Sequence, residues 1–114
     1  MSGVQVATEN RGDAAVVALD GTIDGSSVAE AQAKILPQIA PGCRLVLDMA
    51  NLEYMSSAGL RMLLLIFRQV TGQGGKVALA GLSEEIKDTM SLTGFLDFFT
   101  TTETVEEALA AVRA

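Results

Sequence analysis

Histidine and tryptophan are absent from this chain of 114 residues, and cysteine occurs once. Without histidine, the chain has no His-dependent catalytic triad, no imidazole acid–base catalysis and no His-ligated metal. A single cysteine makes no internal disulfide and no multi-cysteine zinc site, which is typical of proteins of the reducing cytoplasm. The composition therefore predicts a small cytoplasmic protein that is not an enzyme and that has no metal or cofactor.

Basic residues are also scarce. The chain has 8 Lys and Arg against 14 Asp and Glu, which gives a net charge of −6. Sequence-independent nucleic-acid binding depends on Lys and Arg, so no nucleic-acid partner is expected. The most apolar stretch, 60–70, contains Arg61 and Arg68 and is far shorter than the ~20 residues of a membrane-spanning helix. The start of the chain lacks the pattern of a signal peptide, so no membrane association is expected.

Apolar β-branched runs alternate with helical patterns along the chain, and turn residues separate them. Strands are expected at 4–8, 14–19, 44–49 and 76–80, with a short one at Phe98-Phe99. Helices are expected from the serines at 26–27 to Pro41-Gly42, from the serines at 56–57 to Thr71, from about Ser83, and after Thr104. Strands that alternate with helices predict an α/β fold with a largely parallel or mixed sheet.

Several residues predict where these elements begin and end. Ser27 with Glu30, and Thr104 with Glu107, have the spacing of a capping box. Asp20-Gly21 is expected to close the second strand with a turn. The helices are therefore expected to begin directly after these serine and threonine residues.

Ser56 and Ser57 stand between a predicted strand and a predicted helix, where serine is a common N-cap. The turn is similar to a hydrolase nucleophile elbow, but Met55 replaces the elbow glycine and the chain has no histidine to activate a hydroxyl. A helix start also accepts a phosphate, because its free N–H groups and its dipole favour an anion. A phosphate adds a charge of about −1.5 to −2, which changes any docking surface around it. From the residues alone, a plain cap and a phosphorylation switch both stay open.

Asp48 ends a predicted central strand, the usual place for sites on α/β sheets. It raises the alternative of a receiver domain that is phosphorylated on aspartate. A receiver carries two adjacent acids after its first strand, and this chain has no such pair. Asp20 and Asp24 are therefore expected in turns and caps.

The segments 45–49 and 55–61 together resemble the signature of the STAS-domain anti-sigma factor antagonists of bacteria. The element at 21–24 matches the family's Gly-x-Leu/Ile-Asp pattern, and the segments 72–79 and 92–96 match as well. The resemblance covers essentially the whole chain, in order and at compatible spacing. It implies one STAS-like domain over residues 1–114, with a mixed four- to five-stranded sheet and about four helices.

The resemblance also implies a partner-switching role. In the family, the unphosphorylated antagonist binds a serine kinase of the GHKL type that doubles as an anti-sigma factor, and the sigma factor is freed. The kinase phosphorylates a serine at a helix start and releases the antagonist, which a PP2C-type phosphatase restores. Alignment on Gly59 places the acceptor at Ser57. Many members carry an acid directly before the acceptor, where this chain has Ser56, so Ser56 is the alternate acceptor.

Partner contacts are expected around this turn. The partner-binding residues that the resemblance implies are Asp24, Ser26, Met55, Ser56, Ser57, Gly59 and Arg61. Methionine adapts well to interfaces but also fills cores, and Met49, Met55 and Met62 all lie near the turn in sequence. An alternative function of another class is a STAS subunit of a lipid-transport ATPase complex, which binds its ATPase without being switched.

Overall fold

The computed structural model describes residues 3–114, which form one α/β domain with a five-stranded sheet and four α-helices. The strands are β1 (Val4–Arg11), β2 (Ala14–Ile23), β3 (Arg44–Met55), β4 (Lys76–Ala80) and β5 (Thr100–Thr102). They lie in the order β1-β2-β3-β4-β5, with β1 antiparallel to β2 and every other pair parallel. The predicted fold class, a mixed sheet with helical cover, is confirmed.

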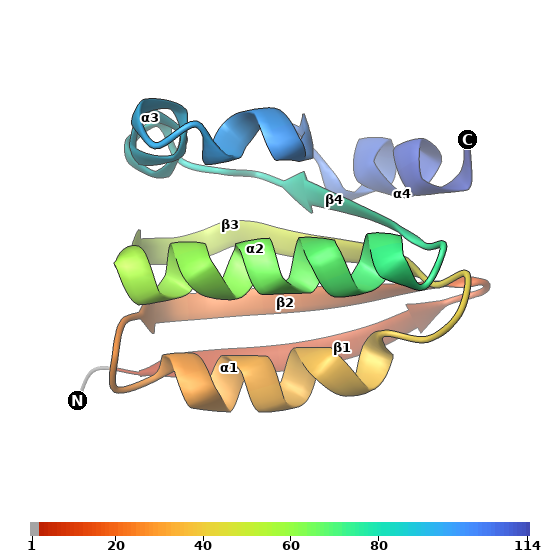
Figure 1. Ribbon diagram of the computed structural model, residues 1–114, viewed down its shortest axis with the longest axis horizontal. Helices are drawn as coiled ribbons and strands as arrows, with labels where there is room; N and C mark the ends of the chain where they lie inside the picture. Colours follow the sequence, from red (N-terminus) through yellow and green to blue (C-terminus); the bar gives the residue numbers. More distant parts are fainter. Residues whose placement is uncertain (1–2) are drawn as a thin grey trace.

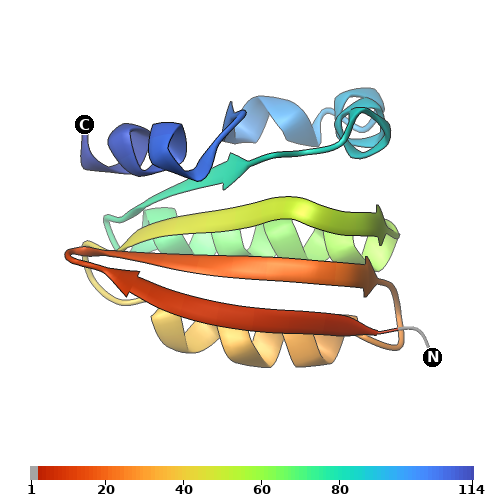
Figure 2. The same cartoon turned by 180° about the vertical axis from the view of Figure 1, so that it is seen from behind.

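The helices cover the two faces of the sheet unequally. They are α1 (Val28–Ile35), α2 (Ser57–Gly72), α3 (Glu84–Leu92) and α4 (Val105–Arg113), with 3-10 turns η1 (Leu36–Gln38) and η2 (Phe95–Phe98). Helices α1 and α2 lie in front of the sheet in Figure 1. From behind, in Figure 2, β1, β2 and β3 lie in front of these two helices. None of the helices described in residues 3–114 is long and apolar enough to cross a bilayer.

Two hydrophobic clusters follow from this unequal cover. The larger cluster packs long side chains of the sheet against α1, α2 and α3, and includes Ile35, Leu47, Ile66 and Met90. The smaller cluster lies under α4 and consists mostly of alanine and valine. Small side chains bring α4 close to the sheet, whereas bulky ones fill the layer under α2.

Strand β2 differs from its predicted end. It continues to Ile23, so the turn predicted at Asp20-Gly21 is wrong, and Asp20 lies within the strand. Gly21 has a φ of 107°, and a Cβ there would lie 2.5 Å from the backbone oxygen of Gly3. The pairing of β2 with β3 shifts on both sides of this glycine. A bulge, which the sequence signals in the same way as a turn, lets the strand continue.

Other boundaries also differ from the predictions, among them the end of β1, which lies at Arg11 and not at Thr8. Strand β3 continues beyond its predicted end because Leu52 and Met55 remain buried. The helix predicted up to Pro41 ends at Ile35 and tightens into η1. The last strand was predicted at Phe98-Phe99, but β5 follows these residues, because Phe98 belongs to η2 and packs on α2.

Candidate functional site

The start of α2 lies at the carboxyl ends of two neighbouring parallel strands. Met55 ends β3 and pairs with Ile23, the last residue of β2. The backbone N–H of Ser56 donates to the carbonyl of Ile23 at 2.8 Å. This hydrogen bond holds the serine turn beside the loop that follows β2, at the edge of the sheet where α/β proteins commonly carry their sites.

The two serines of the turn have different surroundings. Ser56 is half-buried and is the N-cap, and its Oγ accepts from the N–H of Ala58 at 3.2 Å. Ser57 is exposed and is the first residue of the helix. No hydrogen bond found within residues 3–114 involves its hydroxyl, so that group is open to a reaction partner.

Two of the expected partner-binding residues lie beneath the turn. The side chain of Met55 is 5 % exposed, and Gly59 is buried against it. A Cβ at Gly59 would overlap the Met55 side chain and lie 3.1 Å from Cγ2 of Ile23. These residues set the height of the first turn of α2 over the sheet. Met49 and Met62 are also buried in the core.

The loop after β2 is closed by its own hydrogen bonds. The carboxylate of Asp24 accepts from the N–H of Ser26 at 2.9 Å and from its hydroxyl at 2.6 Å. These bonds, with a smaller contribution from Ser27, hold the pKa of Asp24 below its ordinary value. The loop therefore presents an ionised carboxylate beside the serine turn.

Ser27 does not form the predicted capping box. It occupies the N-cap of α1, but its side chain makes no cap hydrogen bond. Its hydroxyl instead donates to the carbonyl of Thr22 at 2.8 Å and accepts from the N–H of Asp24 at 3.0 Å. Ser27 is 4 % exposed, so it ties the loop to β2, and the capping box with Glu30 is wrong.

The charge at the start of α2 differs from that of the other helices. The first turns of α1, α3 and α4 each contain glutamate, whereas that of α2 contains no acid. Arg61, one turn into α2, is exposed. The positive end of the α2 dipole therefore has no carboxylate within its first turn, and a cation follows it.

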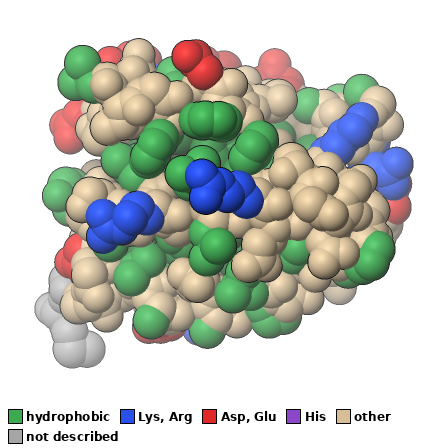
Figure 3. Space-filling model, in the orientation of Figure 1, with side chains coloured by type: hydrophobic (Ala, Val, Ile, Leu, Met, Phe, Trp, Pro, Cys, Tyr) green, Lys and Arg blue, Asp and Glu red, His purple; other side chains and the backbone are tan. Residues whose placement is uncertain are grey.

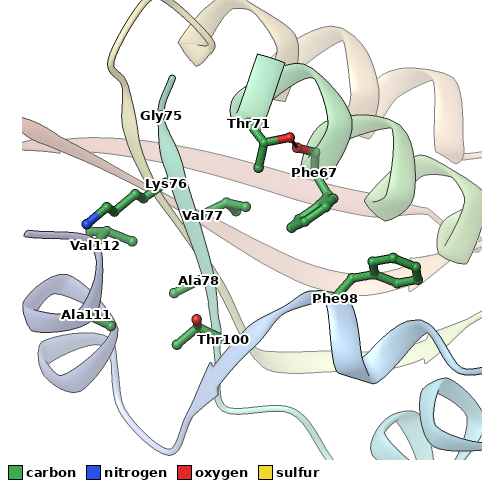
Figure 4. A pocket seen from close by; sticks show the side chains of 10 residues that line it. All are labelled: Phe67, Thr71, Gly75, Lys76, Val77, Ala78, Phe98, Thr100, Ala111 and Val112. Carbon is green, nitrogen blue, oxygen red and sulfur yellow. Dashed lines mark hydrogen bonds between the residues drawn. The ribbon is translucent and has the colours of Figure 1, made fainter. Parts of the chain in front are cut away.

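A groove lies far from this turn. It has a volume of about 190 Å³ and is lined by residues of α2, β4, β5, η2 and α4, among them Phe67, Lys76 and Phe98 (Figure 4). Lys76 at its rim donates to the backbone oxygen of Ala114. Residues 3–114 contain no cluster of three side chains able to hold a metal ion. The groove and the serine turn are separate features.

This chain is similar in sequence and in fold to known proteins of one family. The family model described as the STAS domain matches residues 5–108. The curated relative BtrV of Bordetella bronchiseptica, whose name proposes an anti-sigma factor antagonist, is 32% identical over 99 residues, covering 86% of this chain and 85% of BtrV. The anti-sigma-B factor antagonist of Bacillus subtilis is 32% identical over 81 residues, covering 71% and 74%.

Solved structures show the same fold. The anti-sigma factor antagonist SpoIIAA in its unphosphorylated form has a TM-score of 0.77 at 21% identity and covers 96% of both chains. SpoIIAA of Bacillus in its phosphorylated form has a TM-score of 0.70 at 24% identity, covering 96% of this chain and 99% of that one.

Proposed function

Because the chain belongs to the STAS-domain family, we propose that it is a phosphorylatable anti-sigma factor antagonist. In its unphosphorylated state it binds a serine kinase of the GHKL type that is also an anti-sigma factor. Phosphorylation of Ser57 releases it, and a PP2C-type phosphatase restores it. The names of the relatives support the anti-sigma factor as partner.

The exposure of Ser57 carries this proposal. Its hydroxyl lies at the first residue of α2 without a hydrogen-bond partner among the described residues, while Ser56 uses its own hydroxyl to cap the helix. A kinase reaches Ser57 without unfolding the turn, whereas the half-buried Ser56 Oγ already accepts from the N–H of Ala58, and its phosphorylation would break that hydrogen bond. Ser57 is therefore favoured over Ser56 as the acceptor.

The electrostatics of α2 favour the same residue. A phosphate on Ser57 would add about −1.5 to −2 charge beside unpaired N–H groups at the positive end of a helix dipole. No acid in the first turn of α2 opposes it. The fold therefore tolerates the phosphate, and the change falls on the surface that the partner covers.

The surface around Ser57 supplies the proposed docking contacts. Asp24, Ser26 and Arg61 reach the surface near the turn, and Met55 and Gly59 support it from below. A desolvated phosphate in such an interface, without a matching cation on the partner, opposes binding strongly. Phosphorylation thus acts as a switch in affinity. The chain itself supplies no catalysis, because the partner carries out the phosphoryl transfer.

Incubation with the GHKL-type serine kinases encoded in the same genome, each purified, tests the proposal. With ATP, mass spectrometry is expected to find one phosphate, on Ser57, in the wild type and in the matched control Ser56→Ala. Ser57→Ala is expected to remain unmodified.

Calorimetry with the same kinases measures the switch. Ser57→Glu is expected to raise the Kd by about 100-fold or more, because a buried unpaired charge costs several kcal/mol. Tight binding that neither ATP nor Ser57→Glu alters would contradict the proposal. It would favour the unswitched alternative, a subunit of a lipid-transport ATPase complex.

A further inference from the structure

One face of α2 carries an exposed stripe that begins at the acceptor serine. Ser57, Arg61, Leu64 and Arg68 are spaced i, i+4, i+7 and i+11, so they share one side of the helix. The three polar members are exposed and Leu64 is half-buried. The first and last members are 11 positions apart, which corresponds to about 16 Å along the helix. We call these four residues the α2 stripe.

The two arginines of the α2 stripe differ from the other cations in the described chain. Six of the eight Lys and Arg residues have a carboxylate or carbonyl partner: Arg11, Lys34, Arg44, Lys76, Lys87 and Arg113. Neither the Arg61 nor the Arg68 side chain forms an ion pair or a hydrogen bond within residues 3–114. In a protein of net charge −6, the unpaired positive charge is thus gathered on a single helix face.

Apolar side chains flank this positive charge. Phe98 of η2 is 50 % exposed, and its ring lies 5.7 Å from that of Phe67 on the neighbouring side of α2. Figure 3 shows hydrophobic side chains around the basic ones near the middle of this face, with acidic side chains toward the edges of the view. Apolar contacts beside charged anchors are typical of a protein interface.

We infer that the partner docks along the whole α2 stripe, and that it places carboxylates opposite Arg61 and Arg68. The inference rests on the proposed function and adds to it the length of the contact and the chemistry of the partner. Elsewhere the cations of the described residues already have carboxylate or carbonyl partners, so an acidic partner surface is attracted mainly to this face. Complementary charge of this kind fixes orientation and speeds association.

Arg68 makes the inference separable from the switch. It lies about 16 Å from Ser57 along the helix. A phosphate on Ser57 and the helix dipole interact only within the first turn, and Arg68 lies well beyond it. It is exposed and without a partner in the described residues, so its replacement leaves the fold intact. An effect of Arg68 on binding therefore reports a contact that extends beyond the serine turn.

Titration of unphosphorylated Arg68→Glu with the purified GHKL-type serine kinase that binds the wild type tests this inference. The Kd is expected to rise about three- to tenfold, and binding is expected to depend less on salt concentration than in the wild type. Lys34→Glu is the matched control. It makes the same change of charge on α1, where Lys34 already pairs with Glu30 at 3.5 Å, and its Kd is expected to stay within about twofold of wild type.

Three outcomes would overturn the inference. An Arg68→Glu Kd equal to that of the control, with binding still abolished by Ser57→Glu, removes the long contact and leaves the switch intact. A wild type that self-associates through this face, and loses that association in Arg68→Glu, assigns the α2 stripe to a second copy of the chain. Failure of every kinase to bind the wild type removes the proposed function as well. Recovery of Arg68→Glu binding by an acid-to-lysine change in the partner would identify the opposing carboxylate.

Discussion

Helices α2 and α4 begin in opposite ways. At α4, Thr104 and Glu107 form a complete capping box, in which the Thr104 hydroxyl accepts from the N–H of Glu107 at 3.2 Å and the Glu107 carboxylate accepts from the N–H of Thr104 at 3.1 Å. At α2, Ser56 caps the helix with one hydrogen bond, and no acid occupies the first turn. The N–H groups at the start of α4 are bonded by the chain's own side chains, and a carboxylate offsets the helix dipole there. The start of α2 lacks that carboxylate, so its positive potential is available to an anionic group.

The third residue of each helix explains the difference. In α4 this residue is Glu107, which is exposed and free to turn back toward the cap. In α2 it is Gly59, which is buried against Met55. A glutamate at that position has no room, so α2 is unable to form a capping box. The close packing that positions the serine turn also leaves it without an acid.

Gly59→Ala tests the packing half of this comparison and has the largest expected effect. The added Cβ would overlap the Met55 side chain, and overpacking of a tight core usually costs about 1–3 kcal/mol. Gly72→Ala, at the other end of α2, is the matched control because no atom lies within 4 Å of its added Cβ. It is expected to be neutral or to stabilise the helix by up to about 1 kcal/mol. Urea denaturation measures the free energy of unfolding of both variants. Equal values would show that packing against Met55 does not require glycine at position 59.

Removal of the two caps gives the next largest effect. Thr104→Ala breaks the reciprocal box of α4 and is expected to lower the free energy of unfolding by about 1–2 kcal/mol. Ser56→Ala removes a single hydrogen bond from α2 and is expected to lower it by about 0.5–1 kcal/mol. Denaturation of the two variants and of the double variant measures both costs. A larger loss for Ser56→Ala would reverse the ranking of the two helix starts.

The sequence predicts the starts of α2, α3 and α4 correctly but gives the wrong hydrogen bonding at the start of α1. The capping box of Thr104 and Glu107 and the caps at Ser56 and Ser83 are local patterns, and the structure confirms them. Ser27 shows the same pattern with Glu30, but its hydroxyl bonds to Thr22 instead. That carbonyl comes from β2, so the competing bond depends on tertiary structure.

In the rest of the fold, too, features set by local sequence were predictable and features set by tertiary contacts were not. The α/β class and the order of elements depend on hydrophobic periodicity and were predictable. The continuation of β2 through Gly21 was not, because it depends on the approach of Gly3 from outside the strand. At the candidate site, the serine turn was found from its local pattern. Arg68 was missed, although its i+11 spacing from Ser57 was available, because only the ion pairs of the other cations make it distinctive.

Ser57→Asp supplies the acid that α2 lacks. A carboxylate in the first turn is expected to stabilise the helix by about 0.3–1 kcal/mol at low salt, and the same change is expected to weaken partner binding. Thermal unfolding measures the gain, which is expected to shrink in 1 M salt because the dipole interaction is screened. Ser57→Asn is the matched neutral control. A loss of stability in Ser57→Asp relative to this control would show that the start of α2 does not favour an anion.

The smallest expected effect concerns two carboxylates, one near the start of α2 and one near the end of α4. Asp24 has a lowered pKa because the neutral hydroxyl and N–H of Ser26 donate to it. Asp13 has a lowered pKa because Arg113 donates to it at 3.0 Å, and the charges of Arg113 and Arg44 add to this effect. Salt screens charge–charge interactions but leaves short hydrogen bonds to neutral groups largely unchanged. NMR titration is therefore expected to show the pKa of Asp13 rising toward its ordinary value in 1 M salt, while that of Asp24 moves less.

The sign of the linked change in stability is the same for both residues. A carboxylate whose folded pKa is lowered stabilises the protein above its unfolded pKa of about 3.9, and this contribution is lost as the pH falls through the folded pKa. Asp13→Asn and Asp24→Asn are each expected to flatten the acid limb of the stability profile. The effect of Asp13→Asn is expected to be smaller in 1 M salt than at low salt, and that of Asp24→Asn is not. An equal response of both variants to salt would mean that the loop beside α2 depends on charge in the same way as the end of α4, and the contrast between the two helices would then be confined to their first turns.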